Sequence, residues 1–231
     1  MNDAIIHQGR ALLAAQQALD RTANNMANIG TVGFKRDQPW QSFEQTLANA
    51  TPPVDWSEGK SMETGEPLDL AVSGPGLFVV NTPNGERYTR DGRMKLSLSN
   101  GEARLVSTGG FEVQGESGPI VADPSGGAVT VGRDGTVRQG TSTLGKLRLA
   151  WPEHLQDLTK EGGGLFASQS TPAAVAQPVI RQGYLESSNA EGPVEMVGMI
   201  NVMRTFETNA RSVKTQDGSW QRLIQALNGR I

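Results

Sequence analysis

Cysteine is absent from the 231-residue chain, and histidine occurs only as His7 and His154. The chain therefore has no disulfide, no thiolate nucleophile and no cysteine-ligated zinc. His7 falls in a sequence typical of an amphipathic helix and His154 in a turn after Trp151-Pro152, so the two form no recognisable ligand pair. We expect no catalytic residue, no metal site and no cofactor.

Excess charge, aromatic residues and long apolar runs are also scarce. The formal net charge is -3 and aromatic residues make up 5% of the chain, which argues against a basic surface or a base-stacking platform for nucleic acid. No stretch approaches the roughly 18 apolar residues of a membrane-spanning helix. Residues 1–30 lack the basic start and apolar run of a secretory signal. We expect no nucleic-acid partner, no membrane insertion and no cleaved signal peptide.

Proline and glycine are distributed unevenly, and their distribution divides the chain into three parts. Residues 3–29 contain no proline and one glycine, whereas nearly all glycines and the prolines lie between 30 and 193. The predicted fold class is a mainly β central domain with long N- and C-terminal α-helices that pair as a coiled-coil-like helical domain. The predicted domains are a terminal helical domain of 1–33 and 190–231, an extended connection of 34–66 and a β-rich outer domain of 67–189.

The N-terminal segment has apolar residues at a spacing of seven. They are Ile5, Leu12, Leu19 and Met26, with Gln8, Ala15, Thr22 and Ile29 at the intervening positions. A spacing of seven residues keeps a narrow stripe of side chains facing a partner helix, as coiled coils require. Asp3 is a residue type that caps helix starts.

The C-terminal segment repeats this pattern over a longer stretch, and Pro193 suits its first turn. Only Asp217 is charged in a register of alternating three- and four-residue steps. An ordinary amphipathic helix packed on its own domain is the alternative interpretation. We expect an assembly interface at these positions, with Asp217 fixing register by pairing with a donor group. The full register is Met196, Met199, Met203, Phe206, Ala210, Val213, Asp217, Trp220, Ile224, Leu227 and Ile231.

The central part has the pattern of short strands joined by tight turns. Asn84-Gly85, Asp91-Gly92, Asn100-Gly101 and Asp134-Gly135 are dipeptides that favour type I′ hairpin turns. Alternating stretches such as MKLSLS and KLRLA predict strands with one buried face. Several such strands about ten residues apart predict a β-sandwich or a partly closed barrel.

Three asparagines gather where the first helix is predicted to end. Asn28 and Gly30 are predicted to terminate that helix, because asparagine competes for backbone hydrogen bonds and glycine adopts positive φ without strain. Asn24 and Asn25 have amide groups that could fix the register against a neighbouring helix, and simple capping is the alternative. We include all three asparagines in the predicted assembly interface.

The stretch ANNMANIGTVGFKR (23–36) resembles the N-terminal signature of the rod and hook proteins of the bacterial flagellum. The central stretch YTRDGRMKLSLSNGEARLVSTGGFEVQG and the later stretches VGRDGTV and QGYLESSNAEGPVEMVGMINVMRTFETN are similar to further segments of that family. These stretches cover most of the chain in the family's order. Ala190-Glu191-Gly192-Pro193 departs from the family's usual residues, which affects only where the last helix begins.

The resemblance implies a structural, non-enzymatic subunit of the flagellar rod. It implies export through the flagellar type III apparatus, a periplasmic location in the basal body, and assembly with copies of itself and other rod proteins into a helical tube. The short path from Lys35 to Leu68 resembles the proximal rod members of the family, and a distal rod protein is the alternative.

A different class of protein is also compatible with the sequence, namely a β ligand-binding module carried on a coiled-coil oligomerisation stem. A hydrolase on a β scaffold would be a third possibility, but the chain offers no candidate residues for it. Binding modules need a concave site with aromatic residues. A cleft that unites Trp40, Trp56 and Trp151 would therefore favour the binding module.

Overall fold

The computed structural model describes residues 2–39, 52–99 and 101–228, without the side chains of 2–8, 216, 217, 220, 221, 223, 224 and 226–228. The chain forms two compact units. The first, here called the helical unit, comprises residues 1–28, 37–54 and 190–231. The second, here called the β unit, comprises residues 29–36 and 55–189.

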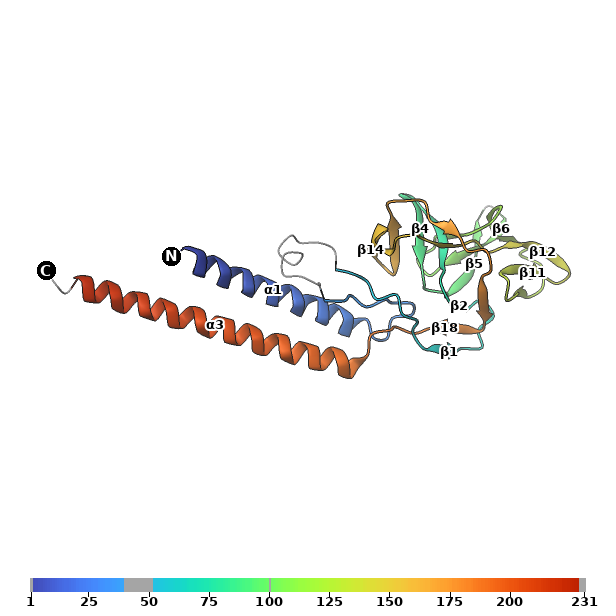
Figure 1. The fold of residues 1–231 in the computed structure, drawn as a ribbon. Helices are drawn as coiled ribbons and strands as arrows, with labels where there is room; N and C mark the ends of the chain where they lie inside the picture. The colour runs from blue at the N-terminus through green and yellow to red at the C-terminus, as the bar shows by residue number, and fades with distance from the viewer. Residues whose placement is uncertain (1, 40–51, 100, 229–231) are drawn as a thin grey trace. The chain divides into compact units, whose positions relative to one another are not determined.

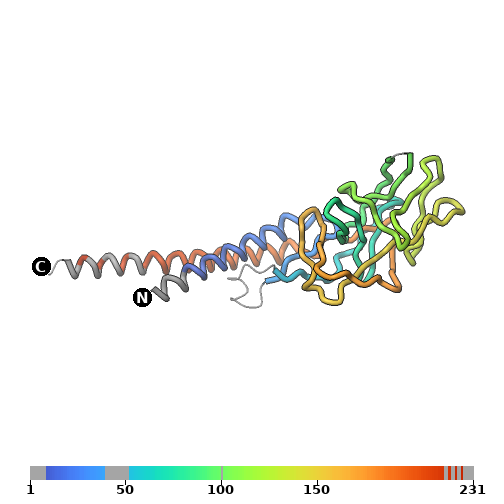
Figure 2. The backbone as a smooth tube through the Cα atoms, turned by 90° about the horizontal axis from the view of Figure 1, so that it is seen from above, coloured from blue at the N-terminus to red at the C-terminus, as the bar shows by residue number. Residues whose placement is uncertain are grey.

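The helical unit contains α1 (Asn2–Ala27) and α3 (Gly192–Asn228). The two helices lie side by side in both views (Figure 1 and Figure 2). At the end of α1 the side-chain amide of Asn28 donates to the backbone oxygen of Asn24 at 2.9 Å and satisfies one of the last helical carbonyls. The predicted role of Gly30 is wrong, because Gly33, with φ of 67°, is the first glycine with positive φ.

The predicted fold class is wrong in pairing the terminal helices as a coiled-coil-like domain. Met196, Met203 and Phe206 of the predicted seam are 56%, 48% and 42% exposed. Small and polar residues face the contact between the helices instead, since Thr22 and Glu195 are buried. Gly198 also lies against Thr22, because a Cβ built on Gly198 would be 3.7 Å from the methyl group of Thr22. Strands also dominate the chain, with eleven of them in one sheet.

The β unit is antiparallel throughout its described strand pairs, and Figure 1 shows its strands. The strands are β1 (Ser61–Glu63), β2 (Leu70–Ser73), β3 (Leu77–Thr82), β4 (Gly85–Thr89), β5 (Met94–Ser99), β6 (Glu102–Ser107), β7 (Glu112–Gly115), β8 (Gly118–Pro119), β9 (Val121–Ala122), β10 (Val129–Val131), β11 (Thr136–Gln139), β12 (Ser142–Lys146), β13 (Leu149–Trp151), β14 (Leu158–Gly162), β15 (Leu165–Ser168), β16 (Ala173–Ala174), β17 (Val179–Gln182) and β18 (Tyr184–Glu186), with a 3-10 helix η1 (Leu155–Asp157).

The large sheet has the strand order β14-β15-β4-β3-β7-β6-β5, and β8, β9, β13 and β16 pair beside this path. The strand β3 lies inside the sheet, and its residues 77–80 are fully buried. Burial on both faces explains why this strand is a continuous apolar run instead of an alternating one. Smaller sheets pair β10-β11-β12, β1-β18 and β17-β2.

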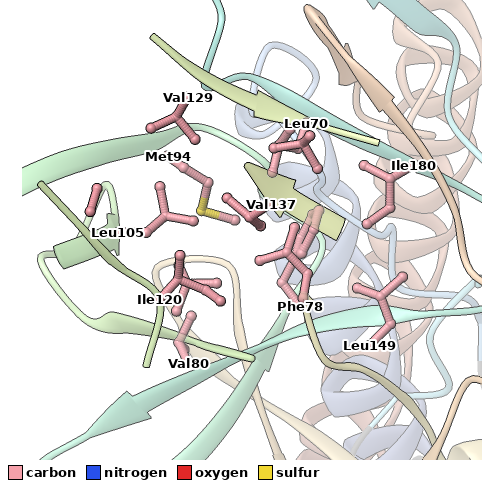
Figure 3. Packing of buried hydrophobic residues seen from close by; sticks show 14 of the residues in the cluster. Leu70, Phe78, Val80, Met94, Leu105, Ile120, Val129, Val137, Leu149 and Ile180 are labelled. Atoms are coloured by element: carbon pink, nitrogen blue, oxygen red, sulfur yellow. The ribbon is translucent and has the colours of Figure 1, made fainter. Parts of the chain in front are cut away.

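The hydrophobic core lies within the β unit. Figure 3 shows the side chains of Leu70, Phe78, Met94, Leu105 and Val137 gathered between strands that are distant in sequence. Burial of each such side chain stabilises the fold by about 1.5–3 kcal/mol. The core therefore stabilises the β unit without help from disulfides.

The predicted hairpin turns are in part confirmed. The β5–β6 hairpin pairs Ser99 with Glu102, and Gly101 has φ of 83°. The β3–β4 hairpin is also present, but its paired residues Thr82 and Gly85 place Pro83 and Asn84 in the turn. The prediction for Asp91-Gly92 is wrong, because these residues link β4 to β5, which are not paired to each other.

Candidate functional site

The exposed side of α3 is the first candidate surface. Six large apolar side chains along its first four turns remain accessible in the isolated chain, between 42% and 59% exposed. At 3.6 residues per turn, Met196, Ile200 and Met203 share one side of the helix, and Val194, Val197 and Phe206 lie further round it. Exposed apolar side chains that cluster on a surface mark sites of protein–protein contact. The six residues, here called the α3 apolar row, are Val194, Met196, Val197, Ile200, Met203 and Phe206.

The other predicted interface residues on the helices are only partly buried or lie outside the described side chains. Leu12, Leu19, Met26, Met199 and Val213 are partly buried. Ile5, Asp217, Trp220, Ile224 and Leu227 lie outside the described side chains, so the proposed register role of Asp217 stays a prediction.

The three asparagines of α1 have different surroundings. Asn25 is 2% exposed, and its amide exchanges two hydrogen bonds with the backbone of Asp37, at 3.0 Å and 2.9 Å. The same amide nitrogen donates to the Glu195 carboxylate at 3.3 Å, which links α1 to the start of α3. Asn24 is exposed, and Asn28 caps the helix as described above. Within the helical unit, Asn25 therefore holds Asp37 and Glu195 against α1 by hydrogen bonds. An interface role for the three asparagines stays a prediction.

The β unit contains a buried group of three charges, here called the ionic junction, formed by Lys35, Arg90 and Glu186. The Glu186 side chain is 5% exposed, and the other two are each 2% exposed. Lys35 Nζ donates to Glu186 Oε1 at 2.6 Å, and Arg90 Nε donates to Glu186 Oε2. The Gly59 amide also donates to Glu186 Oε1, at 2.8 Å. One carboxylate thus joins three segments of the chain.

The hydrogen bonds of the ionic junction extend to backbone carbonyls, as buried charges require. Lys35 Nζ also donates to the Ser57 carbonyl at 2.7 Å, and the Arg90 guanidinium donates to the carbonyls of Val72, at 2.7 Å, and Gly76. Burial raises the pKa of the Glu186 carboxyl, but the charges of Arg90 and Lys35 outweigh this effect and lower it. The carboxylate therefore stays ionised between its two cations.

A second polar cluster lies beside the ionic junction in sequence. Arg36 Nε donates to Asp55 at 2.9 Å, and the Ser57 amide donates to Asp55 at 3.0 Å. The side-chain amide of Asn189 donates a hydrogen bond to the Asp55 carbonyl at 2.8 Å. Its oxygen accepts a hydrogen bond from the Arg36 backbone amide at 2.7 Å. Segments 35–36, 55–57 and 186–189 are thereby held together inside the β unit.

The Asp55 carboxyl predicts an acid-sensitive contribution to stability. Burial alone would raise its pKa, but the hydrogen bonds from Ser57 and Arg36 outweigh this and lower the pKa to about 2. Because the folded pKa is depressed, the contribution is present above about pH 4 and is lost as the pH falls towards 2. We expect Asp55→Asn to cost about 2 kcal/mol at pH 7 and much less at pH 2.5, measured by urea unfolding. An equal cost at both pH values would contradict this assignment.

An aromatic pocket of about 230 Å³ lies in the β unit next to the ionic junction. Trp56 and Trp151 meet edge to face with ring centroids 5.6 Å apart, and Trp56 also contacts Phe166 at 4.9 Å. Trp40 lies outside the described residues, so two of the three tryptophans are shown to converge. The pocket, here called the Trp pocket, is lined by Lys35, Trp56, Glu58, Gly74, Pro75, Arg90 and Trp151.

No metal or membrane-spanning site is found in the described part of the chain. Among those residues, no three His, Asp or Glu side chains gather as ligands would. None of the described helices has an apolar stretch long enough to cross a bilayer. His154 precedes η1 and makes no side-chain capping bond to it.

The sequence prediction missed the ionic junction. A signal was present, because Glu186 follows Tyr184-Leu185 in a strand-like stretch and Lys35 follows Phe34, so each charge adjoins apolar residues. Charges in such positions are buried only when paired. The sequence alone could not show that residues 35, 90 and 186 meet, since their separation along the chain gives no periodic pattern.

Three family models match the chain in order. Residues 5–35 match the flagella basal body rod protein model, 71–139 the flagellar hook protein FlgE/F/G D1 domain and 181–226 the flagellar basal body rod FlgEFG protein C-terminal model. The chain is 35% identical to the flagellar basal-body rod protein FlgF of Caulobacter vibrioides, over 86% of this chain and 87% of that one. It is 30% identical to FlgF of Mesorhizobium japonicum over 100% of both chains. It is 31% identical to FlgG of Buchnera aphidicola subsp. Schizaphis graminum over 92% of this chain and 95% of that one.

Proposed function

The chain belongs to the family of flagellar basal-body rod and hook proteins, and on that premise we propose that it forms part of the proximal rod. The family prediction made from the sequence is confirmed, and the chain is a structural subunit of the flagellar rod. The proposal adds a periplasmic location, export through the flagellar type III apparatus without a cleaved signal peptide, and no enzymatic activity.

The proximal position is supported by relatives named FlgF that match over most of their length. Relatives named FlgG match over a similar share of the chain, so a distal rod subunit is the alternative within the family. For the assembled rod we also propose a helical rod core of 1–33 and 190–231, a connection of 34–66 and an outer β domain of 67–189; within the single chain, residues 29–36 and 55–66 belong to the β unit. The β ligand-binding module loses its support, because the relatives named for the flagellar rod cover nearly the whole chain.

The α3 apolar row carries the proposal for assembly. Six apolar side chains that remain exposed in one chain would be buried by neighbouring subunits, and each burial would stabilise the assembly by up to about 1.5–3 kcal/mol. Contacts of this kind between unlike surfaces that do not close generate helical filaments. We propose that copies of the chain and other rod proteins cover this row in a helical tube, together with the predicted positions on α1 and the last turns of α3.

Replacing Met203 by aspartate tests this role. Met203 is 48% exposed, so a charge there should leave the isolated fold intact while it destroys the apolar contact in the assembly. We expect cells whose only copy is Met203→Asp to lose motility at least tenfold and to yield few basal bodies that contain the chain. Motility is measured in soft agar, and the basal bodies are purified and probed for the chain.

Met203→Leu is the matched control, because it keeps an apolar side chain of similar size. It should support motility close to that of the unaltered chain. Normal rods in the Met203→Asp cells would show that the α3 apolar row is not part of the assembly surface. Circular dichroism of both purified variants shows whether either change affects folding.

A further inference from the structure

The strand β5 is an edge of the large sheet and runs without irregularity. Its six residues pair with β6 in one continuous register, whereas the opposite edge strand, β14, has a register shift between Lys160 and Gly162. A bulge of that kind protects an edge against the addition of a further strand, and a regular edge lacks this protection. The β5 edge is therefore the more open of the two to a partner.

The hydrogen bonds around β5 show which of its backbone groups face away from the sheet. Leu96 pairs with Leu105, but the Leu105 amide donates to the Ile120 carbonyl at 3.0 Å, on the far side of β6. The pair is therefore one without mutual hydrogen bonds, in which the N–H and C=O groups of Leu96 point away from β6. Because this direction alternates along a strand, Leu98 repeats the direction of Leu96. Within the described part of the chain, these outward groups of the two leucines have no hydrogen-bond partner.

The open part of the β5 edge has clear limits. At the start of β5 the Met94 amide donates to the Leu68 carbonyl at 3.2 Å, so the outward direction is already occupied there. At the other end the chain returns after Ser99 to pair with β6 at Glu102. Residues 95–99 are therefore the stretch that is open to a further strand.

Apolar side chains follow the same open stretch. Leu98 is 71% exposed and Leu96 is 39% exposed. Opposite them on β6 lie Ala103 and Leu105, which belong to the hydrophobic core. Directly opposite residues of two strands have their side chains on the same face of the sheet. The two leucines thus continue the core face beyond the last strand, where an added strand would cover them.

A second copy of β5 is complementary to this edge. We propose that two copies of the chain pair antiparallel through β5 about a two-fold axis at Ser97. Leu96 of each copy then lies opposite Leu98 of the other, and these two pairs exchange four hydrogen bonds through their outward groups. Apolar side chains meet apolar side chains. Lys95, the one charged residue of the strand, lies opposite Ser99 and not opposite a second lysine.

Only this register uses all the outward groups of the two leucines. A shift by two residues in one direction places Leu98 opposite Met94, whose amide is already bonded, and a shift in the other direction places Leu96 opposite a position beyond the end of β5. A two-fold contact closes after two copies and does not extend a filament. The pair is therefore a contact of the free chain, and the inference does not rest on the proposed function.

The absence of cysteine allows a test that reads this register. In the proposed pair the two Ser97 Cα atoms lie about 4.5 Å apart, which suits a disulfide. We expect the purified full-length Ser97→Cys chain, concentrated and mildly oxidised, to form covalent dimers at least tenfold faster than Ser99→Cys. Ser99 is the matched control, because it lies on the same face of β5 and is more exposed than Ser97. Its two copies would be about 14 Å apart, four residues along the strand.

Two further variants test the pairing itself. A mixture of Lys95→Cys and Ser99→Cys chains should link, because these residues lie opposite each other, while neither chain should link alone. Leu98→Pro removes one outward N–H group and no hydrogen bond to β6, since proline is tolerated on edge strands in this orientation. Added to Ser97→Cys, it should slow the linking at least tenfold.

The outcomes decide the inference without affecting the rod role, whose tests use α3. Ser99→Cys linking as fast as Ser97→Cys would overturn the two-fold register. Absence of linking in every variant would overturn pairing between copies and leave the edge to a strand of another protein. Linking that Leu98→Pro does not slow would also overturn the pairing, provided that circular dichroism shows a folded chain. If Leu98→Pro does not fold, Leu98→Lys replaces it, because a charge in the apolar contact should slow the linking as well.

Discussion

Glu186→Ala is expected to lower the free energy of unfolding of the β unit by about 3–5 kcal/mol. The substitution leaves Lys35 and Arg90 buried, each 2% exposed, without the carboxylate that both bind. Removal of one partner from a buried charge group is costly because the remaining charges keep their desolvation penalty. A loss of this size is a large share of the 5–15 kcal/mol that stabilises a typical domain. Urea unfolding followed by tryptophan fluorescence measures it.

The matched control removes a glutamate from an exposed ion pair in the same unit. Glu161 pairs with Arg87 at 2.5 Å and is 40% exposed, so Glu161→Ala should change the unfolding midpoint little. Glu186→Gln should fall between the two, because its amide oxygen can still accept hydrogen bonds from the cations. Equal midpoints for Glu186→Ala and Glu161→Ala would mean that the ionic junction does not stabilise the β unit.

Gly92→Ala is expected to be the most damaging single methyl addition in the β unit. A Cβ at Gly92 would overlap the carbonyl oxygen and carbon of Leu70, and both of these are backbone atoms that cannot rotate away. The Leu70 amide also donates to the Gly92 carbonyl at 3.0 Å, so the two segments cannot separate without losing this bond. We expect a loss of at least about 3 kcal/mol, since overpacking a rigid site costs 1–3 kcal/mol or more.

Gly127→Ala serves as the control for this prediction. A Cβ at Gly127 would meet no atom within 4 Å, and its φ is not in the positive range. The change should therefore be neutral or slightly stabilising through the entropy of the unfolded chain. Thermal unfolding of both variants gives the comparison, and a Gly92→Ala chain as stable as Gly127→Ala would show that residues 70 and 92 are not packed as described.

The reason for a glycine at position 92 could not be predicted from the sequence. Asp91-Gly92 has the composition of a hairpin turn, yet glycine is required there because another backbone passes close to it. Turn chemistry is local and can be predicted from neighbouring residues, as with Gly101 in the β5–β6 hairpin. Close approach between residues 70 and 92 depends on the tertiary fold, and no local pattern encodes it.

The helices show a related limit. The apolar spacing predicted helical segments near both ends of the chain, and both helices are present as α1 and α3. The pattern could not show which neighbour each apolar residue meets. Met196, Met203 and Phe206 of α3 are exposed, while Thr22, Asn25 and Glu195 occupy the contact between the helices. A chain that assembles with others encodes those contacts in the same pattern as its own fold, so sequence periodicity alone cannot separate them.

Burial of the α3 apolar row in the rod is tested by the rate at which a maleimide labels Met203→Cys. The chain has no other cysteine, so the label reports this position alone. Labelling is compared between the purified chain and isolated basal bodies, with Asn84→Cys in the β3–β4 turn as the reference. We expect rapid labelling of Met203→Cys in the free chain and at least tenfold slower labelling in basal bodies. Equally rapid labelling in both would show that the rod leaves the α3 apolar row exposed.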